Sequence, residues 1–363
     1  MFSMFSSLPG HRFVKEHWLT IAFVLGFVTD FLLLNRVDDT VDNLVLLFYV
    51  LLATLSLILF YVAVSERGPQ WLQRFLSWGT PLSMQYAFGG LLSGMLIFYG
   101  RSGDLVASAP FLLVIVSVIL MNELVEKRSD RLLYNLTVYF IGLFSYTVLM
   151  VPVWLGDMGN AIFIGSGLLA LLLFFSLVQV LKAIIPNFLT LELRWLVFII
   201  GSLYALFNAF YFMNLIPPIP LSLTELSIYQ GVEREGTTYR ITKEVAPWYR
   251  TLPIPGLPPV FRPISGQGAT CFARVYAPTD LRTTIVHRWE YKDESGDWQL
   301  LFTKPYEISG ENKGGYRGFT TSLNIRDGVW RCSVENSRGQ VLGREVFRVD
   351  TSSAPQNIVT VVE

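Results

Sequence analysis

The first 215 residues consist of long apolar stretches separated by short polar segments, whereas the rest of the chain alternates apolar and polar side chains over short runs. A helix needs about 20 largely apolar residues to span a bilayer, and only a helix satisfies its own backbone hydrogen bonds there. The pattern therefore predicts about seven transmembrane helices in residues 1–215. They run from about 17 to 35, 43 to 64, 81 to 100, 105 to 122, 132 to 154, 160 to 185 and 195 to 215.

The third and fourth stretches are the least regular of the seven. Only the short segment YGRSGDLV separates them, and the fourth is short for a span. They are also compatible with a re-entrant hairpin. That alternative changes the number of crossings by two, so it leaves the C-terminal part on the same side of the membrane.

Residues 264–363 carry the signature of an all-β domain. Short runs of alternating apolar and polar residues recur there with turn residues between them, and together they predict an immunoglobulin-like antiparallel sandwich. The runs cover residues 268–277, 283–291, 298–306, 316–325, 328–336 and 340–349.

Period-two alternation assigns the inward residues of this sandwich. It places His287 and Trp289 on one face of their strand, and Trp330 and Cys332 on the inner face of another. Trp289 lies between Cys271 and Cys332, roughly where an immunoglobulin domain keeps its core tryptophan. His287 is either a ligand or acid–base group, or a neutral core histidine, and the alternation favours the core role.

Cys271 and Cys332 are the only two cysteines, and both lie in the predicted β domain. A disulfide between them would close a loop of 61 residues and would require an oxidising compartment. The alternative is a pair of small core residues that never form a bond.

Residues 216–263 form a proline-rich connector between the two parts. The segment 226–245 alternates on both sides of a Glu-Gly turn and predicts a hairpin near the membrane surface. Trp248 and Tyr249 suit either headgroup depth or packing against the sandwich.

Charge is scarce and unevenly distributed. Charged residues make up 15% of the chain and hydrophobic residues 52%, with a mean hydropathy of +0.46 and no net charge. Of the 28 Lys and Arg residues, 11 fall in residues 1–215. This composition is too apolar for one soluble globule, and neither part has the positive charge that would indicate nucleic-acid binding.

Basic residues in the short loops predict the orientation, because they accumulate on the cytoplasmic side. Nine lie on the side of the N-terminus and two on the other, so seven crossings place residue 216 onward outside the cytoplasm. The nine are Arg12, Lys15, Arg67, Arg74, Lys127, Arg128, Arg131, Lys182 and Arg194, and the two are Arg36 and Arg101. The first stretch has no small-residue cleavage site after it, which favours an uncleaved anchor over a signal peptide.

Several segments together resemble a known family. They are CFARVYAP, TTIVHRWEYKD, the stretch from YRGFTTSLNI to GREVFRV, and the membrane exit NLIPPIPLSLTELSIYQGV, with HRW and GVWRCSVENSRGQVLG the most specific parts. They are similar to bacterial membrane proteins that carry the domain of unknown function 2914 (DUF2914). The resemblance implies an inner-membrane protein with an exported β domain, and it implies no activity.

Motifs of catalysis and cofactor binding are missing. The sequence has no HExxH, G-x-S-x-G, P-loop, CxxC or dinucleotide fingerprint, and its three histidines cannot build a histidine-rich metal site. We therefore expect no catalytic residue, metal or cofactor. Asp38, Asp39 and Asp42 could hold a hard cation through carboxylate oxygens, but a solvated loop is the simpler explanation.

Asp30 is the one acid well inside a predicted span. Charged groups at that depth are costly and are often functional. It lies near the end of its helix, so it can also reach the interface. A functional role would use a hydrogen bond to Asn208, Gln85 or Tyr204 on another helix, and these define a candidate intramembrane polar site.

A candidate contact face is predicted on the β domain. If Cys271 points inward, Phe272, Arg274 and Tyr276 point outward, and aromatic and arginine side chains are enriched at interfaces. Cover by the membrane-proximal hairpin is the alternative.

Two further patterns concern helix packing. Gly90 and Gly94, and the GSG at residues 165–167, suit close helix contacts either within one chain or between two. Trp71, Phe75 and Trp78 share one helical face, which is typical of an interfacial helix or of a lead-in to the third span.

These observations leave three hypotheses. The first is a non-enzymatic inner-membrane protein that presents an extracytoplasmic β-sandwich to an envelope protein or glycan. The second is a transporter, or an enzyme for a lipid-linked substrate, with the β domain as a lid. The third is a receptor, which the short cytoplasmic loops disfavour. A deep polar cavity among the helices would indicate the second, and an exposed apolar face on the sandwich the first.

Overall fold

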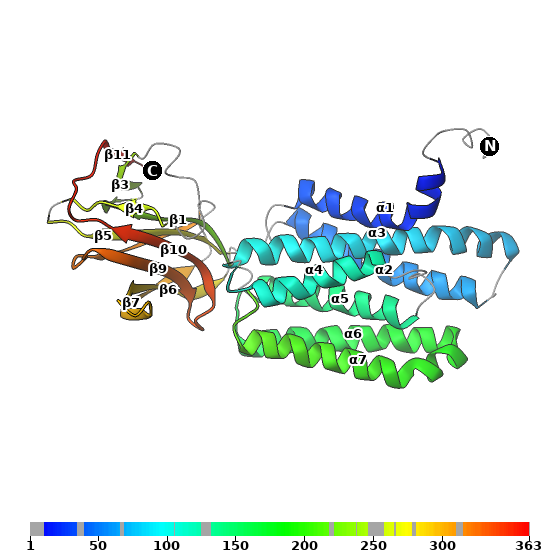
Figure 1. Cartoon of the computed structure of the whole chain (residues 1–363). Coiled ribbons are helices and arrows are strands. Elements are labelled where there is room, and N and C mark those ends of the chain that lie inside the picture. The colour runs from blue at the N-terminus through cyan, green and yellow to red at the C-terminus, as the bar shows by residue number, and fades with distance from the viewer. Residues whose placement is uncertain are drawn as a thin grey trace. The chain divides into compact units, whose positions relative to one another are not determined.

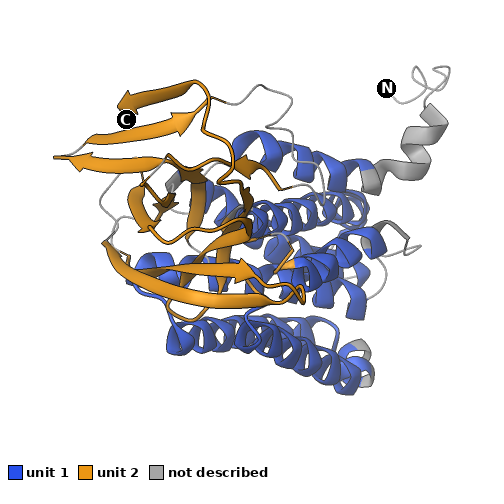
Figure 2. Ribbon diagram, turned by 60° about the vertical axis from the view of Figure 1, so that its left-hand side comes forward, with its two compact units in different colours: residues 1–100, 109–215 blue, residues 101–108, 216–363 orange. Residues whose placement is uncertain are grey.

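A computed structural model of the chain describes most residues of both predicted parts. They are residues 11–34, 40–65, 69–104, 106–124, 132–217, 221–236, 238–245, 258–264, 266–277, 281–309 and 315–362. The described residues form seven helices followed by eleven strands (Figure 1). The chain divides into two compact units (Figure 2). The first comprises residues 1–100 and 109–215, and the second residues 101–108 and 216–363.

The helical unit contains the seven predicted helices. They are α1 (His11–Leu33), α2 (Thr40–Val64), α3 (Gln70–Ser102), α4 (Ala109–Leu124), α5 (Leu132–Leu155), α6 (Asn160–Ile184) and α7 (Pro186–Phe212). In Figure 1, α1 and α3 lie at one side of this unit and α6 and α7 at the other.

Five of the described helices are long and apolar enough to cross a membrane, with mean hydropathies between 1.2 and 2.6. They are α2, α3, α5, α6 and α7. The apolar segments of α1 and α4 are shorter, at Ile21–Leu33 and Ala109–Met121. At 1.5 Å per residue, each spans about 20 Å of a hydrocarbon core that is about 30 Å thick. The prediction of seven helices is confirmed, and that of seven crossings is supported for five.

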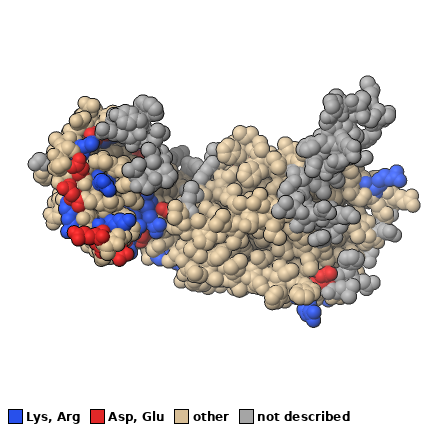
Figure 3. All heavy atoms as spheres, in the orientation of Figure 1, with Lys and Arg blue, Asp and Glu red and all other residues tan. Residues whose placement is uncertain are grey.

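Large apolar side chains are exposed on the outside of this unit. Phe31, Leu32, Leu172 and Phe198 have exposed fractions of 67%, 72%, 64% and 65%. On the face shown in Figure 3, the helical unit carries few charges, whereas charged side chains gather over the β unit. An apolar surface of this extent is unfavourable in water and favourable in hydrocarbon.

Glycines allow α1 and α3 to approach each other at backbone distance. A Cβ at Gly26 would lie 2.8 Å from the backbone nitrogen of Gly90, and one at Gly89 would overlap the carbonyl of Phe23. Gly94, one turn after Gly90, lies against Leu46 of α2. The small residues of α3 therefore serve packing within this chain.

The two glycines of the second pattern, at residues 165–167, differ in their contacts. A Cβ at Gly167 would lie 2.8 Å from the ring of Tyr204 on α7, whereas one at Gly165 would meet nothing within 4 Å. Of these two glycines, only Gly167 is part of a close helix contact with the described residues.

This difference supplies a matched pair of variants. We expect Gly89→Ala to lower the stability of the helical unit by about 1–3 kcal/mol, because the added methyl group forces the two helices apart. Gly165→Ala should be neutral or should stabilise by up to about 1 kcal/mol, since alanine favours the helix and has free space there. Thermal unfolding in detergent, followed by circular dichroism, measures both. Equal losses in the two variants would contradict the close contact.

The aromatic stripe before the third apolar stretch belongs to a longer helix. Trp71, Phe75 and Trp78 are exposed at 71%, 65% and 58% on the first turns of α3, which continues without interruption to Ser102. Pro81 lies within this helix. The structure therefore places the stripe at the start of the helix that contains the third apolar stretch, without a separate interfacial helix.

The β unit contains eleven strands in three sheets. The strands are β1 (Ser222–Tyr229), β2 (Gly231–Glu235), β3 (Thr238–Glu244), β4 (Val260–Phe261), β5 (Ala269–Tyr276), β6 (Arg282–Lys292), β7 (Trp298–Ser309), β8 (Tyr316–Ser322), β9 (Gly328–Asn336), β10 (Val341–Val349) and β11 (Ile358–Val362). The sheet orders are β1-β5-β8, β4-β10-β9-β6-β7 and β11-β3-β2. All pairs are antiparallel except β10 with β4.

The six predicted runs all form strands, from β5 to β10, and two sheets share one core. That core contains Cys271 of β5 together with Trp289, Trp330 and Phe347 from the five-stranded sheet. The indole ring of Trp289 stacks on Phe302, with 5.9 Å between ring centroids. The two sheets thus pack face to face through residues that are far apart in sequence.

The connector is more ordered than the sequence predicted. The first part of the predicted hairpin belongs to β1, which pairs with β5 of the sandwich, and only β2 and β3 form the hairpin. A third strand, β11 near the C-terminus, pairs with the other side of β3 and extends the hairpin to a three-stranded sheet. The prediction missed both pairings because strand partners at long sequence separation leave no local signal. Trp248 and Tyr249 lie outside the described residues.

Candidate functional site

Asp30 lies at the centre of a polar contact between three helices. It is fully buried on α1, and one carboxylate oxygen accepts a hydrogen bond from the hydroxyl of Tyr49 on α2 at 2.7 Å. The other oxygen accepts one from the hydroxyl of Ser93 on α3. The ring of Tyr49 lies against Gly90, which has no side chain to block it. The small residues of α3 thus make room for the tyrosine that reaches Asp30.

The predicted partners of Asp30 were wrong. Asn208 donates to the carbonyl of Tyr204 in its own helix α7, at 2.8 Å, and α7 lies on the opposite side of the bundle from α1 (Figure 1). Gln85 is buried on α3, eight positions before Ser93, which is about 12 Å along a helix. Tyr49 and Ser93 were missed because hydroxyl groups are common in apolar helices and carry no distinctive spacing.

The acidic group after the first span is only partly described. Asp38 and Asp39 lie outside the described residues, and Asp42 is buried in the first turn of α2, with 3% of its surface exposed. Negative charge there interacts favourably with the N-terminal end of the helix dipole.

The predicted contact face of β5 is covered. Phe272 is fully buried under the hairpin, among Tyr229, Tyr239 and Ile241. Arg274 forms an ion pair with Glu225 of β1 at 3.2 Å. The prediction of an outward interaction face was wrong at Phe272, because β2 and β3 pack on that side of the sheet and form a second small core. The alternative, cover by the hairpin, is what the structure contains.

His287 is a buried residue of the core and is held by two hydroxyl groups. Its Nδ1 lies 3.0 Å from Thr320 Oγ1, and its Nε2 lies 3.1 Å from the hydroxyl of Tyr306. The indole N–H of Trp289 donates to the same threonine oxygen at 2.9 Å. Burial lowers the pKa of His287 to about 4, so the ring is neutral at physiological pH. The network satisfies the ring nitrogens of His287 and Trp289, as polar atoms in a packed interior require.

Thr320 connects this network, and its replacement is a direct test. We expect Thr320→Val to destabilise the β unit by about 2 kcal/mol, because it leaves Nδ1 of His287 and the indole N–H of Trp289 without their partner. Thr303→Val is the control, since Thr303 is exposed on β7 and valine suits a strand. Urea titration followed by proteolysis of the unfolded β unit measures the difference. A loss of less than 0.5 kcal/mol would contradict the importance of the network.

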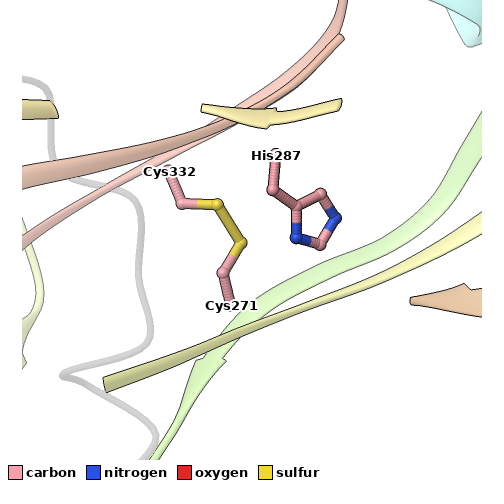
Figure 4. A group of neighbouring side chains, drawn as sticks. All are labelled: Cys271, His287 and Cys332. Carbon is pink, nitrogen blue, oxygen red and sulfur yellow. A yellow bond between two sulfur atoms is a disulfide. The ribbon is translucent and has the colours of Figure 1, made fainter. Parts of the chain in front are cut away.

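The cysteines form a disulfide beside this histidine. Cys271 of β5 and Cys332 of β9 are joined across the two facing sheets, and both are fully buried (Figure 4). The donor atoms of these cysteines and of His287 lie within 4.8 Å of one another, and these residue types are zinc ligands. Bonded sulfurs offer no thiolate, so the oxidised form has no metal site at these three residues.

A cavity that the sequence did not predict lies at one side of the sandwich. It has a volume of about 240 Å³ and is bounded by parts of β1, β3, β4 and β10. Glu345 of β10 lines it, and burial raises the pKa of this carboxyl to about 7. The signal that could have revealed this residue is an acid two places before the buried Phe347, on the same face of the strand.

The β unit also has an exposed apolar edge. β7 is an outer strand of the five-stranded sheet, and its Leu300 and Leu301 are exposed at 51% and 45%. Trp298 at the start of this strand lies under the guanidinium of Arg331, 4.2 Å from the ring centroid. Edge strands with apolar side chains are pairing sites unless they are protected.

Comparisons with curated proteins and with solved structures add little to the interpretation of these sites. No curated protein matches the sequence. Among solved structures, the alkylpurine DNA glycosylase AlkC of Pseudomonas fluorescens, bound to DNA containing an abasic site analog, aligns with 12% identity over 82% of this chain and 78% of that chain. The TM-score is 0.20, so this likeness carries no argument about fold or activity.

The five strands from β6 to β10 are the part of the chain that a family model recognises. The HRW motif is in β6, and the GVWRCSVENSRGQVLG motif spans β9 and the start of β10. The matched range therefore holds both of the most specific segments of the resemblance. Residues 282–349 match the family described as "Protein of unknown function (DUF2914)", which confirms the resemblance for this part of the chain.

Proposed function

We propose that the chain is a multi-pass protein of the bacterial inner membrane that presents an immunoglobulin-like β-sandwich outside the cytoplasm, where the sandwich binds a protein or glycan partner of the envelope. Membrane insertion is supported by the exposed apolar side chains of the helical unit. The orientation is supported by the basic residues, which are concentrated on the side of the N-terminus.

The number of crossings does not alter this orientation. Seven spans, or the five helices that meet the length requirement without α1 and α4, are both odd numbers. An odd number places residue 216 onward opposite the N-terminus. The disulfide between Cys271 and Cys332 agrees with an oxidising compartment on that side.

The state of the two cysteines in cells tests the location, since the chain has no others. We expect a maleimide of high molecular mass, added to acid-quenched and denatured cells, to leave the electrophoretic mobility of the chain unchanged. After treatment with dithiothreitol it should add two shifts. Two shifts without the reductant would place the β unit in the cytoplasm and would contradict the proposal.

The exposed edge β7 is the observation that carries partner binding. The network around His287 and the ion pair of Arg274 occupy other polar groups of the domain, whereas Leu300 and Leu301 remain exposed. An extended segment can pair with such an edge through main-chain hydrogen bonds, and apolar side chains add contact area.

Photocrosslinking in intact envelopes tests this edge. A photoreactive residue at Leu300 should give a discrete adduct, and one at Val260 serves as the control, since it is exposed at 46% on β4 at the other end of the same sheet. Protease or glycosidase digestion then identifies the kind of partner. Only adducts of the chain with itself, or equal adducts at both positions, would contradict binding at β7.

The transporter or lipid enzyme is the second hypothesis, and the geometry of Asp30 weakens it. Both carboxylate oxygens accept hydroxyl hydrogen bonds from neighbouring helices, an arrangement that supports a role in packing. Asp30→Asn should then change stability and leave partner crosslinking at Leu300 in place. Loss of a transport or enzymatic activity in that variant would favour the second hypothesis.

A further inference from the structure

The cavity beside β10 is large enough only for a small molecule. Its volume of about 240 Å³ is below the range of about 300–1,000 Å³ that is typical of sites for drug-sized ligands. Its walls combine apolar and polar residues. They are Ser227, Ile228, Tyr229, Gln230, Lys243, Glu244, Pro259, Val260, Phe261, Glu345 and Phe347.

Glu345 points toward the inside of the sandwich. It is directly opposite Cys332 in the pairing of β10 with β9, and opposite residues of an antiparallel pair share one face of the sheet. Cys332 is on the inner face, where it bonds to Cys271. Two positions further along β10, Phe347 is opposite the buried Trp330. A carboxylate thus occupies a position where the pattern of the strand calls for an apolar side chain.

This carboxylate has no partner among the described residues. No hydrogen bond or ion pair joins Glu345 to any of them, and burial raises its pKa to about 7. Glu345 is partly buried, and a carboxylate that has lost part of its hydration is unfavourable unless a ligand or a proton neutralises it. A cationic group bound beside Glu345 would therefore stabilise its ionised form.

The other polar side chains of the cavity differ in whether they already have a hydrogen-bond or ion-pair partner. Glu244 pairs with Arg262 at 3.3 Å and also accepts from the backbone N–H of Gln356. The amide of Gln230 is bonded at both ends, to the carbonyl of Arg262 and to the N–H of Glu244. Lys243, by contrast, forms no ion pair with another described residue. The cavity therefore holds one acid and one base that remain available.

We propose that this cavity binds a small zwitterionic ligand of the α-amino acid type. Its ammonium group lies beside the carboxylate of Glu345, its carboxylate beside the ammonium of Lys243, and its apolar side chain against Phe261 and Phe347. The rings of these two phenylalanines meet edge to face, with 5.8 Å between centroids, and form an apolar wall. The proposal goes beyond partner binding at β7, because it concerns another edge of the sandwich.

Three probes with the same apolar body separate the two charges. Leucine carries both, 3-methylbutylamine only the ammonium, and 4-methylpentanoate only the carboxylate. The full chain in lipid nanodiscs is titrated with each by calorimetry at pH 7. We expect leucine to bind at least tenfold more tightly than either of the other two, because each of them leaves one charge of the cavity without a partner.

Two variants assign the contacts. Glu345→Gln should weaken leucine binding at least tenfold and should not weaken the binding of 4-methylpentanoate. Lys243→Met should weaken leucine binding and should not weaken the binding of 3-methylbutylamine. Glu307→Gln and Lys304→Met, exposed positions on β7, are the matched controls and should bind leucine as the parent chain does.

Proton release gives an independent readout. The ammonium of leucine favours the ionised form of Glu345, so binding at pH 7 should release part of a proton. The measured heat should then depend on the ionisation enthalpy of the buffer in the parent chain and not in Glu345→Gln. Such a signature cannot arise from a loss of folding.

The outcomes are decisive for the cavity. Absence of saturable leucine binding at millimolar concentration, or equal binding in Glu345→Gln and the parent chain, would overturn the proposal. Photocrosslinking at Leu300 is unaffected by either result, so a failure here is distinguishable from a failure of partner binding. Thermal unfolding of Glu345→Gln, expected at or above the temperature of the parent chain, shows that the variant is folded.

Discussion

Removal of the disulfide should lower the stability of the β unit by about 4 kcal/mol. The bond between Cys271 and Cys332 closes a loop with a sequence separation of 61 residues, and the loop-closure entropy that it removes from the unfolded chain corresponds to about 4 kcal/mol. Replacement of both cysteines by alanine tests this in the full chain. Urea titration with a proteolytic pulse, which cleaves only the unfolded β unit, measures the change in the free energy of unfolding.

The single variants make this test specific. Cys271→Ala and Cys332→Ala should each lose nearly the whole stability that the double variant loses, because either substitution already breaks the bond. Two independent core residues would instead give single losses that add up to the loss of the double variant. Additive losses would therefore contradict a stabilising bridge.

Replacement of Glu345 by glutamine should stabilise the β unit at high pH and not at low pH. Burial raises the pKa of this carboxyl from its ordinary 4.5 to about 7. Below pH 4.5 the group is protonated in both the folded and the unfolded chain, so it carries no penalty. Between pH 4.5 and 7 the unfolded chain releases the proton while the folded chain keeps it, and stability falls as the pH rises.

The size of this effect follows from the shift in pKa. Each pH unit corresponds to about 1.4 kcal/mol, so the full penalty above pH 7 is about 3 kcal/mol. Glu345→Gln should recover most of it at pH 8 and nothing at pH 4. Urea titrations at the two values measure the difference between the variant and the parent chain.

Two comparisons isolate the contribution of Glu345. Glu307→Gln, at an exposed position of β7, should change stability at neither pH. His287 contributes a dependence of opposite sign, since its lowered pKa removes stability as the pH falls from 6.5 toward 4. That contribution is common to the variant and the parent chain, so it cancels in their difference. A gain that is equal at pH 4 and pH 8 would contradict the assigned ionisation.

The division of the chain and its elements could be predicted from local pattern. Apolar stretches of a span's length predicted the helices from α1 to α7, and period-two alternation predicted the strands from β5 to β10. These signals succeed because each depends on residues that are close in sequence. The same alternation singled out Trp289 and Trp330, which are buried in the shared core.

The candidate sites were less predictable, because they depend on which elements meet. Phe272 stands on the outer side of β5, as alternation implies, yet the hairpin of β2 and β3 covers it. Asp30 was singled out as a buried acid, but its partners Tyr49 and Ser93 come from two other helices whose packing the sequence does not specify.

The sequence by itself determined that this protein has an apolar helical part, a β part with both cysteines, and basic residues concentrated on one side of the predicted spans, since length, alternation and charge are properties of the chain alone. Only the tertiary structure decided that Glu345 of β10 lines a cavity together with residues of β1, β3 and β4. The reason is physical: the cost of a buried charge, and the ligand that would offset it, depend on which groups surround it, and those groups come from strands that are far apart in sequence.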